Sequence, residues 1–356
     1  MWQTRLTEKI GLRFPIIQAP MAGGATTPEL IAAVSNSGGL GSLGAGYMTP
    51  AEIRHALKTI RKLTNKPFAV NLFIPEEHSA SEAQIQKSCV DIKKSCHELN
   101  IEIEPVTKPY AQSFEEQINV ILEEKIPVFS YAFGLLDAEW ISKLKKNHTI
   151  LIGTATTLAE ARVLEESGID AIVAQGSEAG GHRGTFIGKA EDGLIGLFSL
   201  IPQFVEQIKI PIIAAGGIMD GRGIVAATYL GAEGIQMGTA FLSCFESGIP
   251  DVYKHALLTQ QHDNTVLTRA FSGKLARGIR NQFIERMEAR KINILDYPIQ
   301  NALTSMMRKK AKEQNDIDFM SMWAGQSAQL CRNMSANELI SALVLEAEAL
   351  NPQACE

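Results

Sequence analysis

The segment from 171 to 184, AIVAQGSEAGGHRG, holds the residues best suited to chemistry. Its first four residues are apolar and predict a short buried strand, which Gln175 ends. Gly180 and Gly181 precede His182 in a loop whose glycines let backbone amides approach a ligand closely. A lone histidine is more often structural than catalytic. Histidine titrates near neutrality, however, and a loop position favours function, so His182 is the candidate general base or anion contact.

Two further glycine motifs follow predicted strands near the middle of the chain. Gly216 and Gly217 follow the apolar run 211–215, and Gly238 and Thr239 follow the run 234–237. In a barrel of parallel strands the last two loops often bind a phosphate group through backbone amides. FMN, a sugar phosphate and a nucleotide would all fit. The alternative is that these glycines only permit tight turns.

Four amide side chains lie at or near the ends of predicted strands: Gln18, Asn71, Gln175 and Gln236. A buried amide costs free energy unless its donors and acceptors are bonded. Together they could bind a heteroaromatic ring such as an isoalloxazine. The alternative for any one of them is a hydrogen bond to loop backbone. Three cations further along, Lys274, Arg277 and Arg280, are interpreted as a solvated face.

Composition excludes several classes of function. The net charge of -5 gives no basic surface for nucleic acid. No apolar run reaches the roughly 18 residues that a membrane helix needs, and no signal-peptide core is present. The five cysteines are odd in number and lack CxxC spacing, which indicates reduced thiols in a cytoplasmic protein. No histidine or cysteine spacing indicates a metal site. The sequence is compatible with a homo-oligomer without fixing its size.

Short apolar runs alternate with helical patterns along the first 240 residues. The predicted strands are 15–19, 40–43, 68–73, 128–132, 149–153, 171–174, 211–215 and 234–237. Such alternation predicts a parallel sheet, and eight units predict an α/β fold of the (β/α)₈ TIM barrel type. A doubly wound open sheet is less favoured, because no GxGxxG motif follows the first strand.

The remaining segments define the predicted domain organisation. Capping boxes at Thr49, Thr157 and Ser335 predict helix starts. Residues 1–240 form the predicted barrel, with a polar excursion at about 74–125 that is expected to be a helix pair. Residues 241–356 are expected to form an additional, mainly helical region packed on or over the barrel mouth.

These motifs resemble a known family. QAPMAG at 18–23, Asn71, QGSEAGGHRG at 175–184, AAGGI at 214–218 and QMGT at 236–239 look like class I nitronate monooxygenase, formerly called 2-nitropropane dioxygenase. AFSGKLARGIRN at 270–281 and WAGQ at 323–326 extend the resemblance over nearly the whole chain.

The resemblance implies a barrel that binds FMN noncovalently and oxidises alkyl nitronates, such as propionate 3-nitronate, with molecular oxygen. Carbonyl compound and nitrite or nitrate would be the products of this detoxification reaction. His182 would be the active-site histidine. The implied cofactor-binding residues are Gln18, Ala19, Met21, Asn71, Gln175, Gly180, Gly181, Gly216, Gly217, Gln236, Met237, Gly238 and Thr239.

Two other functions use similar motifs. FMN-dependent reductases that oxidise NADH, acting on enoyl-[acyl carrier protein] or on quinones, share the EAGGH loop and the AAGGI turn. Arg183 after the histidine and Pro20 before Met21 look more like the nitronate enzymes. The non-enzymatic alternative is a barrel that only binds flavin or phosphate, which a turnover assay would distinguish.

Overall fold

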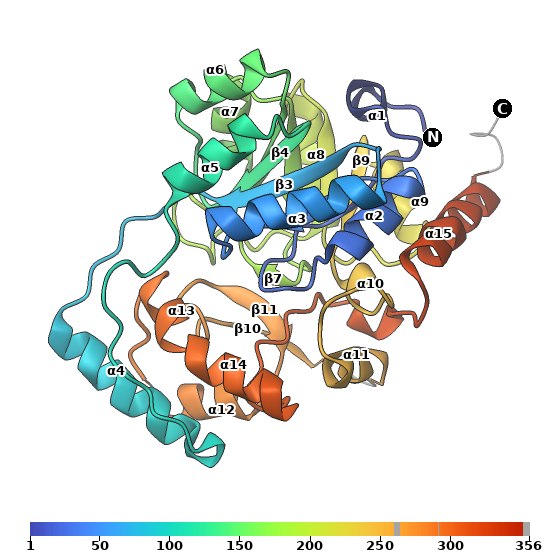
Figure 1. The fold of residues 1–356 in the computed structure, drawn as a ribbon. Helices are drawn as coiled ribbons and strands as arrows, with labels where there is room; N and C mark the ends of the chain where they lie inside the picture. The colour runs from blue at the N-terminus through green and yellow to red at the C-terminus, as the bar shows by residue number, and fades with distance from the viewer. Residues whose placement is uncertain (260–263, 291, 352–356) are drawn as a thin grey trace.

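The computed structural model describes residues 1–259, 264–290 and 292–351 and contains a parallel β-barrel (Figure 1). Eight strands form one sheet in the order β1-β9-β8-β6-β5-β4-β3-β2. Backbone hydrogen bonds from Leu40 N to Ile16 O (2.9 Å) and from Gln18 N to Leu40 O (3.0 Å) join its two ends. The predicted (β/α)₈ fold is therefore confirmed over the doubly wound sheet. The strands are β1 Ile16–Gln18, β2 Gly41–Gly44, β3 Phe68–Phe73, β4 Val128–Ala132, β5 Ile150–Ala155, β6 Ala171–Gln175, β8 Ile212–Ala215 and β9 Gly234–Met237.

Helices cover the outside of this barrel. Thr49, Thr157 and Ser335 each accept a hydrogen bond from the N–H three residues on, so the predicted capping boxes are confirmed. The last of them starts α15 (Ala336–Leu350), which packs against α9 and α2 on the barrel wall rather than over the mouth. The other outer helices are α2 Pro28–Asn36, α3 Pro50–Leu63, α5 Phe114–Glu123, α6 Ala138–Lys146, α7 Leu158–Glu166, α8 Leu197–Gln207 and α9 Gly221–Tyr229. The short helix α1 (Arg5–Ile10) instead packs Leu6 and Ile10 into a separate cluster with strand residues such as Ile17 and Val173.

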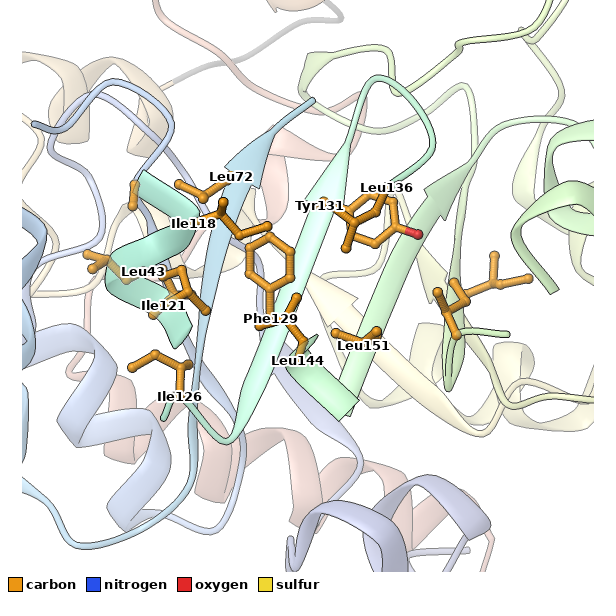
Figure 2. Close-up of a cluster of buried hydrophobic side chains, with 14 of the residues drawn as sticks. Leu43, Leu72, Ile118, Ile121, Ile126, Phe129, Tyr131, Leu136, Leu144 and Leu151 are labelled. Atoms are coloured by element: carbon orange, nitrogen blue, oxygen red, sulfur yellow. The ribbon is translucent and has the colours of Figure 1, made fainter. Parts of the chain in front are cut away.

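The largest apolar cluster fills the space between the strands and these helices (Figure 2). Ile118 and Ile121 on α5 lie beside Phe129 on β4, and all three side chains are fully buried. Burial of one such side chain contributes about 1.5–3 kcal/mol, so this packing fixes α5 against the sheet. The strand ends and their loops are held in place by the same contacts.

The excursion differs from the predicted helix pair. Residues 74–125 contain two helices, α4 (Glu82–Ser95) and α5 (Phe114–Glu123), and a short 3₁₀ turn, η1 (His97–Leu99), but α5 packs against α3 and β3 of the barrel. The apolar side of α4, with Ile85 and Ile92, packs with α12 (Gln282–Ala289) in a second cluster. The excursion therefore joins the C-terminal region below the barrel (Figure 1).

The C-terminal region also contains a sheet that the sequence analysis missed. Strands β10 (Thr265–Thr268) and β11 (Ala276–Ile279) pair antiparallel, and β11 pairs with β7 (Gly181–His182). His182 is thus part of a strand, opposite Ala276. Backbone pairing with β11 restrains the loop that carries it. The remaining elements are α10 Thr239–Leu242, α11 Asp251–Leu258, α13 Ile299–Leu303, α14 Ser305–Gln314 and η2 Ala328–Leu330.

The described part of the chain lacks helices that could span a membrane, clusters of metal-binding residues and disulfides. It has no helix long and apolar enough to cross a bilayer, and no cluster of three residues able to hold a metal ion. Cys89, Cys96, Cys244 and Cys331 are free thiols. The fifth cysteine, Cys355, lies outside the described residues.

Candidate active site

A cavity of about 710 Å³ lies at the carboxyl ends of the barrel strands. This volume falls in the range of roughly 300–1,000 Å³ that small-molecule and cofactor sites occupy. His182 and all but one of the residues expected to bind cofactor line it. Those lining residues are Ala19, Met21, Asn71, Gln175, Gly180, Gly181, Gly216, Gly217, Gln236, Met237, Gly238 and Thr239.

Gln18 is the exception. Its side chain is fully buried and does not line the cavity. Its Oε1 accepts a hydrogen bond from Ser42 N (3.0 Å), and its Nε2 donates to Ser42 O (3.2 Å). This amide therefore hydrogen-bonds to backbone, the alternative considered for each of the four amides. It joins β1 to β2 and does not face a ligand.

The other three amides differ in how far the protein already satisfies them. Asn71 Nδ2 donates to Ser130 Oγ (2.9 Å). Gln175 Nε2 donates to His182 O (3.0 Å), and its Oε1 accepts from Gly184 N (2.8 Å), so this side chain holds the loop. The Gln236 side chain lines the cavity and has no hydrogen-bond partner within the described residues. Its amide is available to a ligand.

The glycines after β8 and β9 form a concave backbone surface. The backbone φ angles of Gly216 and Gly217 are +130° and +68°, values that residues other than glycine rarely adopt. In the described part of the chain the N–H groups of Gly217 and Gly238 have no hydrogen-bond acceptor. A Cβ on Gly238 would lie 3.6 Å or more from any neighbour, so a ligand can approach there. Free N–H groups on glycine turns suit a phosphate.

His182 stands in an aromatic part of the cavity. Its Nε2 lies 2.8 Å from Ser272 Oγ, and its ring centroid lies 5.1 Å from Trp323 and 6.0 Å from Phe133. Burial, followed by the charges of Lys274 and Arg308, lowers the pKa of His182 to about 3. The imidazole is therefore neutral at ordinary pH. It can accept or donate one hydrogen bond, but it supplies no positive charge.

Two cations near His182 were not identified from the sequence as site residues. The Lys274 ammonium lies 2.6 Å from Glu76 Oε1 and 4.5 Å from the Phe133 ring centroid, with its side chain mostly buried. Arg308 on α14 lines the cavity. The interpretation of Lys274 as a solvated residue is wrong, and so is that of Arg277, which is buried and donates to Ser177 O (3.1 Å). Arg277 lies on β11, and Lys274 lies in the segment that leads into this strand, so their burial depends on the tertiary pairing of β11.

Arg183 is the largest fully buried side chain of the described residues. It donates to the carbonyl oxygens of Gly176 (2.6 Å), Gln175 (2.9 Å) and Gly193 (3.0 Å). Burial lowers its pKa to about 10, so the guanidinium stays charged. It therefore joins the two ends of the loop that carries His182.

Similar sequences have a consistent description. A model of the nitronate monooxygenase family matches residues 3–346. A probable nitronate monooxygenase of Staphylococcus aureus (strain Newman) is 47% identical over 347 residues, which cover 97% of each chain. One of Staphylococcus saprophyticus is 45% identical over 349 residues, which cover 98% of each chain.

Solved structures agree. A nitroalkane oxidase from Streptomyces ansochromogenes is 38% identical, with a TM-score of 0.90 over 99% of this chain and 100% of that chain. FabK from Thermotoga maritima is 31% identical, with a TM-score of 0.78 over 100% of this chain and 99% of that chain. The chain belongs to the nitronate monooxygenase family and is an oxidoreductase that oxidises nitronates.

Proposed function

We propose that the cavity binds FMN noncovalently, with its phosphate at the glycine turns after β8 and β9. The observation that carries this proposal is the pair of N–H groups without acceptors at Gly217 and Gly238, in a cavity that also presents the free amide of Gln236. These donors match a phosphate and a ring with carbonyl and N–H groups. Asn71 and Gln175 would lie along the ring while keeping their bonds to the protein.

Bound FMN would supply the two-electron chemistry that links nitronate oxidation to molecular oxygen. The chain's own contribution centres on His182, whose Nε2 is held by Ser272. Its Nδ1 has no partner among the described residues, so this nitrogen is left for a substrate. A neutral imidazole can hydrogen-bond the nitro group of a bound nitronate, or take the α-proton of a neutral nitroalkane. Aromatic side chains around it exclude water.

We propose alkyl nitronates such as propionate 3-nitronate as substrates, with a carbonyl compound and nitrite or nitrate as products. The test has two steps. Purified protein should be yellow and release FMN on denaturation, and it should consume oxygen when propionate 3-nitronate is added. A protein that cannot be reconstituted with FMN would contradict the cofactor assignment. Oxidation of NADH in the presence of a quinone or an enoyl thioester, without oxygen uptake on addition of nitronate, would favour the reductase alternative.

The cytoplasmic location, the homo-oligomer and the division of the chain at residue 240 stay predictions. The four free thiols support a reducing compartment. The second apolar cluster combines residues of the excursion, such as Ile92, with C-terminal residues such as Phe283. This shared core supports a C-terminal unit that includes the excursion and packs beside the barrel.

A further inference from the structure

Arg308 places an uncompensated positive charge in the cavity wall. Its guanidinium donates to Asn301 O (2.7 Å), Asn301 Oδ1 (2.8 Å) and Thr304 Oγ1 (3.2 Å), which are all neutral acceptors. No carboxylate pairs with it within the described ranges. Burial lowers the pKa of Arg308, and the groups that oppose this shift are the phenols of Tyr47 and Tyr297, whose own pKa values are raised. A cation in such a position costs free energy unless an anion compensates it.

The guanidinium is also fixed in orientation. The three hydrogen bonds use its Nε and one terminal nitrogen, Nη2, and anchor both to the α13–α14 turn. The other terminal nitrogen, Nη1, has no acceptor in the part of the chain described. A held arginine loses little further freedom when it binds an oxyanion, and Nη1 still has N–H groups that can donate a charge-assisted hydrogen bond to one oxygen of the anion.

The other charged groups around His182 cannot take this role as well. Lys274 is close to His182, but its ammonium is already paired with Glu76. His182 itself is neutral, for the reasons given above. Burial lowers the pKa of His182 and raises those of Tyr47 and Tyr297, and the positive charge of Arg308 acts to lower all three. His182 and Tyr47 line the same cavity as Arg308. Lys309 and Lys312 also line the cavity, but of these cations only Lys274 and Arg308 contribute to the pKa of His182. Among the described residues, Arg308 is therefore the cation without a carboxylate partner whose charge reaches His182.

We propose that Arg308 binds the negatively charged nitro group of the substrate. A nitronate carries its negative charge on the two oxygens of one planar group, and Nη1 can donate a charge-assisted hydrogen bond to one of them. The cavity would then hold the anion by arginine and leave His182 uncharged. This inference rests on the proposed function of the cavity, because it needs the substrate to occupy the space beside His182.

The test compares Arg308→Met with Arg308→Lys and with Lys310→Met, all in the FMN-loaded protein. Lys310 is on the same helix, does not line the cavity, and has only an exposed pairing with Glu313 at 3.9 Å. Its removal changes the net charge of α14 equally and should matter little. Nitrate, a planar oxyanion that cannot be oxidised, serves as the probe, and its Kd is measured through the flavin absorbance.

Arg308→Met should keep its FMN content and melting temperature but raise the nitrate Kd and the KM for propionate 3-nitronate. Loss of a charged hydrogen bond predicts a rise of roughly 10–100-fold. Arg308→Lys should recover part of the affinity, and Lys310→Met should stay within about twofold of the unmodified protein. The pKa of His182, followed by NMR of labelled histidine, should rise in Arg308→Met, because one of the two cations that lower it is gone.

The outcomes distinguish a failure of the proposed function from a failure of the role proposed for Arg308. If the unmodified protein binds no FMN or oxidises no nitronate, the proposed function fails. If it does both, and Arg308→Met binds nitrate and propionate 3-nitronate as tightly as Lys310→Met does, the role of Arg308 is wrong while the function stands. Equal losses in both variants would show a general charge effect and would also overturn the assignment.

Discussion

His182 Nε2 and Ser272 Oγ lie 2.8 Å apart, although 90 residues separate them in the sequence. Ser272 Oγ also accepts from Lys274 N (3.3 Å) and lies 3.2 Å from Lys274 O. A residue of the C-terminal region thus orients the histidine of a barrel loop. The candidate active site therefore draws on both parts of the chain.

Ser272→Ala should lower turnover of nitronate by about 5–10-fold, the effect of losing one neutral hydrogen bond of about 1 kcal/mol. The ring of His182 would rotate more freely, while the cavity would keep its shape. Steady-state kcat/KM and FMN content measure the two effects. A variant with normal kcat/KM and normal FMN content would show that this contact does not position the histidine.

The state of His182 should be visible in a pH profile. Because its pKa is about 3, it does not titrate between pH 5 and pH 9. The kcat/KM for preformed nitronate should show no inflection near 6.5 from this group. His182→Asn should keep its FMN. Its turnover should fall by roughly 10²–10⁴-fold with a neutral nitroalkane and by less with nitronate, which has no proton to remove. Unchanged turnover of both substrates would make His182 structural.

The same pKa predicts how stability depends on pH. The folded value, about 3, lies below the unfolded value of about 6.5, so the unfolded chain binds the proton first as the pH falls. His182 therefore costs the fold stability progressively as the pH drops from about 6.5 toward 3. The melting temperature of FMN-free protein should fall more between pH 7 and pH 5 than that of FMN-free His182→Asn. An equal fall of the melting temperature in both proteins would indicate that the pKa of His182 is not lowered by folding.

Gly238 offers a matched pair of variants for the phosphate site. Its φ of -101° suits any residue, and a Cβ there meets only ordinary contacts. Gly238→Ala should fold and bind FMN. Gly238→Asp adds a carboxylate next to the proposed phosphate, and like charges repel. We expect its FMN Kd, measured by fluorescence titration, to rise at least tenfold. Equal affinity in both variants would place the phosphate elsewhere.

Arg183→Met removes a buried cation of similar length. The carbonyls of Gln175, Gly176 and Gly193 would lose the guanidinium as donor, and Gly176 O would keep only its bond from Ala179 N (3.1 Å). Each buried acceptor left unpaired costs about 1–3 kcal/mol. The melting temperature should drop, and hydrogen exchange of residues 176–186 should accelerate. Arg183→Lys is the control, since it keeps a charge but can satisfy fewer carbonyls. Unchanged exchange in Arg183→Met would mean that the loop is held by other contacts.

The barrel could be predicted because its signals are local. Each strand is a short apolar run, and caps such as Thr49 and Ser335 mark helix starts. The second sheet could not, because β11 pairs with β7 across more than 90 residues and its sequence, ARGI, is too polar to be recognised as a strand. Arg308 was missed for a related reason. It lies in the polar helix α14, and only tertiary packing decides which of its cations faces the cavity.

The role of nitronate as electron donor is tested most directly by mixing the purified, FMN-loaded protein anaerobically with propionate 3-nitronate and, separately, with NADH. Stopped-flow absorbance follows the flavin. We expect rapid bleaching with nitronate, little with NADH, and return of the yellow colour when oxygen is admitted. Rapid bleaching by NADH, with none by nitronate, would contradict the assignment of nitronate as the electron donor in this cavity.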